Sequence, residues 1–134
     1  MEAFCWPVRV YYEDTDAGGV VYYANYLRFM ERARTEMLRA GGFEQDCLRA
    51  DEGIIFVVKH VDIDYRSPGR FNDQLQVSAE IAAWGRTSIT FRQQVLRDDK
   101  CLAEAQIVVV CLDVARFRPH PIPQSITEAF QRVS

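Results

Sequence analysis

The chain has 134 residues, of which 49% are hydrophobic and 26% are charged, and its formal net charge is −3 at pH 7. This length suits a single domain with a real core, so we expect one domain over residues 1–134. The small negative charge argues against nucleic acid as the main partner. No apolar run approaches the roughly 20 residues of a membrane span, and the short acidic start of the chain is not expected to be a secretory signal.

The first predicted elements are a strand and a long helix. Apolar residues alternate from Phe4 to Tyr12, as in a strand with one buried face. From about Ala24 to Ala40 the apolar spacing becomes three and four, which predicts an amphipathic helix about 25 Å long. Its apolar stripe comprises Tyr23, Tyr26, Leu27, Met30, Ala33, Met37, Leu38 and Ala40. Gly41 and Gly42 end this helix, the only long one that the sequence predicts.

The rest of the chain predicts a short helix, Glu44 to Ala50, and then four strands. Alternating or wholly apolar runs place these strands at residues 57–65, 75–83, 87–95 and 102–112. Short connections indicate antiparallel neighbours, and the last run, apolar on both faces, is expected mid-sheet. The sequence therefore predicts an α+β fold, in which a five-stranded antiparallel sheet curls around one helix (β-α-β-β-β-β). Another subunit is expected to cover an edge or the outer face.

The four cysteines show no metal-ribbon or disulfide spacing. They are Cys5, Cys47, Cys101 and Cys111. We expect buried free thiols in a reducing compartment, and therefore a cytoplasmic protein. The two histidines are expected on a strand surface, for His60, and in a loop, for His120. We consequently expect no metal site.

The segment between the first strand and the helix carries the most chemistry. It places Asp14, Asp16, Gly18 and Gly19 directly before the helix. A carboxylate that faces a helix N-terminus is suited to attacking or hydrolysing a carbonyl compound, because free backbone N–H groups stabilise the developing oxyanion. Asp14 is expected to be structural.

This loop and several later segments match the pattern of a known family. The motif D-x-D-x-x-G-x-V-x-Y spans residues 14–23, and Ala24-Asn25-Tyr26-Leu27 and Glu31-Arg32-Ala33-Arg34 follow it. Residues 63–68, 85–88 and 109–113 match as well. The chain thus resembles, over nearly its whole length, the hotdog-fold acyl-CoA thioesterases. It is most similar to the YbgC-type branch, which is encoded with the bacterial Tol–Pal envelope system and is kin to 4-hydroxybenzoyl-CoA thioesterase.

The resemblance implies hydrolysis of small or medium acyl-CoA thioesters with no cofactor, since coenzyme A is part of the substrate. It makes Asp16 the catalytic carboxylate, which can act as nucleophile or as general base on water. Tyr23 would polarise the carbonyl through its backbone N–H, with Gly19 as a further backbone candidate. The YbgC-type branch commonly has histidine at the Tyr23 position, so this chain retains a backbone donor there but no imidazole.

The resemblance also implies substrate contacts and an assembly. Tyr22 and Tyr26 are expected to line the acyl pocket or to join the core. Guanidinium groups suit the phosphates of coenzyme A, and the preferred candidates are Arg86 and Arg66. The remaining arginine candidates are Arg70, Arg116 and Arg118. The family implies a homotetramer built from dimers, with the active site at the dimer interface.

Two other functions fit the same fold. A hotdog hydratase that acts on acyl carrier protein substrates usually needs an active-site histidine, and none occurs in the Asp16 loop or its helix. A non-catalytic module that binds acyl carrier protein, in lipid or envelope machinery, is the second alternative. A nucleophilic Cys47 has no histidine partner near it in the sequence.

Overall fold

The computed structural model describes residues 3–133. The strands are β1 (Phe4–Arg9), β2 (Ile54–Tyr65), β3 (Gln74–Trp84), β4 (Ser88–Arg97), β5 (Lys100–Asp113) and β6 (Arg118–Pro119). The helices are α1 (Asn25–Ala40), α2 (Gln45–Cys47) and α3 (Gln124–Val133). A 3₁₀ turn, Tyr12–Asp14, follows β1, and a π-helical segment, Leu48–Glu52, continues α2.

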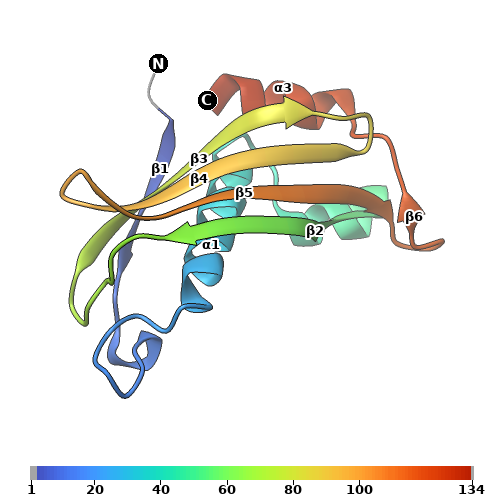
Figure 1. Ribbon diagram of the computed structural model, residues 1–134. Helices are drawn as coiled ribbons and strands as arrows, with labels where there is room; N and C mark the ends of the chain where they lie inside the picture. The colour runs from blue at the N-terminus through green and yellow to red at the C-terminus, as the bar shows by residue number, and fades with distance from the viewer. Residues whose placement is uncertain (1–2, 134) are drawn as a thin grey trace.

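The strands form one antiparallel sheet in the order β1-β3-β4-β5-β2, and β6 pairs with β5. The sheet curls around α1, as Figure 1 shows. The predicted α+β fold is confirmed, and the apolar run 102–112 lies inside the sheet as part of β5. Within residues 3–133, no helix is both long and apolar enough to cross a bilayer.

The core lies between α1 and the concave face of the sheet. Helix α1 buries Tyr26, Phe29, Met30, Ala33, Met37 and Leu38, close to the predicted stripe. Two predicted members are exposed: Tyr23, which precedes the helix, and Ala40, which lies in its last turn. The sheet contributes Leu75, Val77, Ala79, Ile89, Phe91, Val95, Ala105, Ile107 and Val109. Burial of these apolar side chains is the main force that holds helix and sheet together.

The sequence analysis did not predict α3, a ten-residue helix that follows the sheet. It buries Ile126, Ala129 and Phe130. The Phe130 ring packs against the rings of Trp84 and Phe91, at 6.1 and 5.7 Å between centroids. Helix α3 therefore closes one end of the concave face, where the helix α1 stripe alone leaves apolar sheet residues uncovered.

Two smaller predictions also need correction. The first strand ends at Arg9 and not at Tyr12, because the chain turns into the 3₁₀ segment, which leaves Tyr12 80% exposed. No disulfide joins the four cysteines, but Cys5 and Cys47 are exposed, and only Cys111 is fully buried. Cys5 lies on the edge strand β1 and Cys47 ends the short helix α2, which buries no residue, so both thiols lie outside the core. His60 is exposed and His120 lies in a loop, as expected.

Candidate functional site

The Asp16 loop is a tight hairpin held by backbone hydrogen bonds. The N–H of Asp16 donates to the carbonyl of Val20 at 2.9 Å, and the N–H of Gly19 donates to the carbonyl of Asp16 at 3.0 Å. Gly19 has a φ of +80°, a left-handed conformation that glycine adopts without steric cost. Val20 in turn pairs with Arg70, so the hairpin is anchored to the segment before β3.

The Asp16 carboxylate is exposed at the base of this hairpin. Its Oδ1 accepts a hydrogen bond from the N–H of Gly18 at 2.8 Å. A Cβ at position 18 would lie only 3.2 Å from the same oxygen, so glycine permits this close approach. In the described part of the chain no salt bridge neutralises Asp16. The carboxylate is therefore oriented by one bond and otherwise open to a reactant.

Asp14 has the structural role that the sequence suggests. It is buried, and its Oδ2 accepts a hydrogen bond from the N–H of Tyr11 at 2.8 Å. Its carbonyl accepts hydrogen bonds from the N–H of Tyr22 and from Nδ2 of Asn25, both at 2.9 Å. Asp14 thus ties the loop to the first residue of α1, which places Asp16 close to the start of that helix.

The start of α1 presents unpaired amides. Among residues 3–133, no acceptor takes a hydrogen bond from the N–H of Tyr23 or Ala24. Amides at a helix N-terminus point away from the helix and carry partial positive charge. The N–H of Gly19, another predicted donor, is already bonded to the carbonyl of Asp16. Tyr23 and Ala24 are therefore the open donors beside the loop.

A cleft of about 290 Å³ adjoins this helix start. It is lined by Val21, Tyr23, Tyr26, Tyr65, Arg66, Ser67 and Pro68. Tyr26 is buried, and its hydroxyl accepts a hydrogen bond from the N–H of Gly69 at 2.8 Å. Tyr26 thus belongs to both the core and the cleft wall. The sequence analysis named these two environments as alternatives for this residue.

Tyr22 lies beside the cleft, half exposed, with its ring 4.9 Å from that of Tyr23. Hydrogen bonding with Tyr23 is the main cause that raises the pKa of Tyr22, and the charge of Asp16 adds to the rise.

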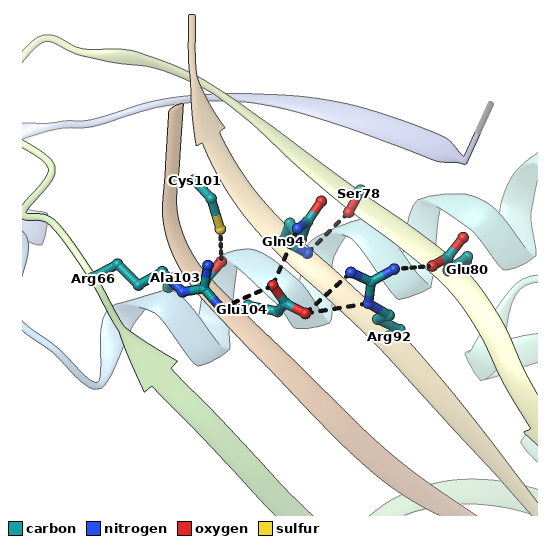
Figure 2. Close-up of polar contacts among 8 residues, drawn as sticks. All are labelled: Arg66, Ser78, Glu80, Arg92, Gln94, Cys101, Ala103 and Glu104. Atoms are coloured by element: carbon teal, nitrogen blue, oxygen red, sulfur yellow. Dashed lines mark hydrogen bonds and ion pairs between the residues drawn. The ribbon is translucent and has the colours of Figure 1, made fainter. Parts of the chain in front are cut away.

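Arg66 connects the cleft to an ion-pair chain on the outer face of the sheet (Figure 2). Its Nη2 lies 3.3 Å from Oε2 of Glu104. Glu104 also pairs with Arg92, and Arg92 pairs with Glu80, at 3.1 and 3.2 Å. These bonds hold the Arg66 guanidinium close to the cleft without burying it, so that it stays available to an anionic ligand.

The other predicted arginines divide between the two ends of the sheet. Arg70 precedes β3 and lies near the Asp16 loop, through its pairing with Val20. Arg86 lies in the β3–β4 connection, at the end of the sheet opposite the Asp16 loop, since β3 begins next to the end of β1 and runs away from it. Arg116 and Arg118 lie at that far end as well, after β5. One chain therefore does not bring Arg86 to the cleft.

Tyr65, Ser67 and Val21 line the cleft but were not predicted as site residues. Tyr65 was expected only as a strand residue, because its alternation with Val61 and Ile63 resembles that of an ordinary half-buried strand. The signal that could have identified Tyr65 is its place in the segment 63–68, which already matched the family pattern.

Comparison with known proteins identifies the family of this chain. Residues 10–130 match the model of the thioesterase-like superfamily. The chain is 47% identical over 130 residues to the acyl-CoA thioester hydrolase YbgC of Escherichia coli O6:H1, and the match covers 96% of each protein. It is 43% identical to the acyl-CoA thioesterase YbgC of Haemophilus influenzae, with 97% and 96% covered.

A solved structure shows the same fold. The crystal structure of a probable thioesterase from Bartonella henselae superposes with a TM-score of 0.87 at 31% identity, and the match covers 91% of this chain and 100% of that one. The curled sheet around α1 is therefore the hotdog fold. On the match of residues 10–130 and on these identities, the chain belongs to the thioesterase-like superfamily.

Proposed function

We propose that this protein hydrolyses small or medium acyl-CoA thioesters and that Asp16 is its catalytic carboxylate. The observations that carry the proposal are an exposed, singly bonded carboxylate in the loop that leads into α1, two unpaired amides at the start of that helix, and a cleft lined by Tyr23. The names of the E. coli and H. influenzae relatives support acyl-CoA as the substrate class.

The arrangement supports a short reaction path. The thioester carbonyl would lie between Asp16 and the N–H groups of Tyr23 and Ala24. Asp16 either attacks the carbonyl carbon itself or takes a proton from an attacking water. The carbonyl oxygen becomes an oxyanion that the amides stabilise, an effect worth about 3 kcal/mol for one donor. Collapse of the intermediate expels the coenzyme A thiolate. In the nucleophilic path, water then hydrolyses the acyl–Asp16 anhydride.

The placement of the arginines supports an assembly in which subunits share the site. Arg66 lies beside the cleft and would contact the phosphates of coenzyme A, with Arg86 as a further candidate. Since Arg86 lies at the opposite end of its own sheet, it reaches such a cleft only from another subunit. We propose a homotetramer of dimers, the assembly that the family resemblance implies, in which a partner helps to complete the substrate channel. We also propose that the protein acts in the cytoplasm, the reducing compartment that its free cysteines suit.

The direct test replaces Asp16 by asparagine, which keeps the size of the side chain. Hydrolysis of a panel of acyl-CoAs of differing length and aromaticity would be followed by release of free thiol. Loss of a general base or nucleophile should lower kcat by about 10²- to 10⁴-fold while the fold and oligomeric state persist. Asp51→Asn, at an exposed position outside the loop, is the matched control and should retain wild-type activity.

Two outcomes would contradict the proposal. Activity of Asp16→Asn within a few-fold of wild type would remove Asp16 from the mechanism. If the wild-type protein hydrolysed no member of the panel but bound acyl carrier protein, the non-catalytic module would be the better explanation.

A further inference from the structure

Tyr65 is held rigidly at the end of β2. It pairs with Ala103 of β5 in the last step of the antiparallel register. The two amides that follow, of Arg66 and Ser67, both donate to the carbonyl of Leu102, at 2.8 and 3.2 Å. The Tyr65 backbone is therefore anchored on both sides, and its side chain extends from a fixed point into the cleft wall.

The Tyr65 side chain contacts the start of α1. Its hydroxyl donates a hydrogen bond to the carbonyl oxygen of Tyr23 at 3.2 Å, across 42 positions of sequence. Its ring lies edge-on to the Tyr23 ring at 6.1 Å and tilted to the Tyr26 ring at 5.6 Å. The hydrogen bond and the ring contacts together hold the end of β2 against the start of α1.

The bonded carbonyl belongs to the peptide group that carries one of the unpaired amides. That group joins Tyr23 to Ala24, and in a trans peptide its carbonyl and its N–H point in opposite directions. The Tyr23 carbonyl also accepts a bond from the N–H of Tyr26, but at a long 3.4 Å. The Tyr65 hydroxyl is thus its shorter restraint. A hydrogen bond to the carbonyl also polarises the peptide and strengthens its N–H as a donor.

We infer that Tyr65 is a positioning residue for the oxyanion donors, since its hydroxyl orients the Tyr23–Ala24 peptide so that the Ala24 N–H faces the reacting carbonyl. The inference rests on the proposed function and adds to it a residue from the far end of β2. Burial, with the neighbouring Tyr23 and Tyr26, raises the pKa of Tyr65 above its ordinary value. The hydroxyl consequently stays protonated, and able to donate, throughout the neutral range.

The test is Tyr65→Phe, which removes the hydroxyl and keeps the ring that packs on Tyr23 and Tyr26. We expect kcat for acyl-CoA hydrolysis to fall about three- to tenfold, the effect of one neutral hydrogen bond, with KM unchanged. Tyr12→Phe, which removes a hydroxyl from an exposed ring outside the cleft, is the matched control and should keep wild-type kinetics. The amide resonance of Ala24 in a ¹⁵N-edited NMR spectrum should shift in Tyr65→Phe and not in Tyr12→Phe.

The following outcomes would overturn the inference. Wild-type kcat in Tyr65→Phe, measured beside an inactive Asp16→Asn, overturns the positioning role and leaves the proposed function standing. A raised KM with unchanged kcat also overturns it, because the hydroxyl would then contact the substrate directly. A wild-type protein that hydrolyses no acyl-CoA overturns both. Should Tyr65→Phe be too unstable for kinetics, an unshifted Ala24 resonance at low temperature would refute the inference.

Discussion

The buried hydroxyl of Tyr26 allows the link between the core and the cleft to be tested quantitatively. Tyr26 is 3% exposed, and its hydroxyl is the acceptor for the N–H of buried Gly69. Tyr26→Phe keeps the ring and its packing on Phe29 but leaves that N–H without a partner. A buried backbone donor that loses its acceptor costs about 1–3 kcal/mol of unfolding free energy.

This cost converts to a measurable shift in melting temperature. Unfolding entropy is about 2.1 cal/mol/K per residue, so for a chain of 134 residues 1 kcal/mol corresponds to about 3.5 °C. Tyr26→Phe should therefore lower Tm by roughly 4–10 °C. Thermal unfolding would be followed by circular dichroism at one protein concentration, because the Tm of an oligomer depends on concentration.

Tyr12→Phe again serves as the control, since loss of an exposed hydroxyl should change stability by less than about 0.5 kcal/mol. Because Gly69 adjoins the cleft residues Ser67 and Pro68, Tyr26→Phe should also raise KM as that wall loosens. A Tm within 1 °C of wild type would refute the reasoning. It would mean that the Gly69 N–H finds another acceptor, and that Tyr26 does not anchor the cleft wall.

The remaining predictions concern an ion pair and a helix contact. Burial disfavours ionised Asp73, but hydrogen bonds from Arg97 and from the Arg70 N–H outweigh it and lower the pKa of Asp73 below 3.8. Its stabilising contribution is thus fully present above the unfolded-state pKa and is lost as pH falls through the folded-state value. In denaturant unfolding from pH 6 to pH 2, Asp73→Asn should be less stable than wild type by up to about 1 kcal/mol at pH 6, with the difference vanishing at the acid end. A Cβ at Gly41 would lie 2.8 Å from the Cβ and 3.0 Å from the carbonyl oxygen of Ala129. Gly41→Ala should therefore lower the free energy of unfolding by about 1–3 kcal/mol, because it disturbs the packing of α3 on α1. Ala129→Gly should recover part of that loss in the double variant. Equal stability of Gly41→Ala and wild type would show that α3 does not pack here.

Local patterns predicted most of the fold. Apolar spacing identified α1 to within a residue of its start, because an amphipathic helix that packs on one sheet must carry one continuous stripe. Two-residue alternation located β2 to β4, a run that is apolar on both faces located β5, and short connections indicated antiparallel pairing. The same spacing is present in Ile126, Ala129 and Phe130, yet α3 was missed: a ten-residue amphipathic segment at a chain end is too short to show, without its tertiary partners, that it packs as a helix.

The candidate site also combines features that the sequence predicts with features that depend on the tertiary structure. The Asp16 loop, Gly19 with its positive φ and the helix start are contiguous in sequence, so their proximity followed from the sequence, and carbonyl chemistry at this site stays a prediction. The hydroxyl of Tyr65 on the Tyr23 carbonyl, the anchoring of Tyr26 by Gly69 and the separation of Arg86 from the cleft depend on strand order and register. Those are properties of the whole sheet, set when distant strands pair and curl, and only the tertiary structure decided them.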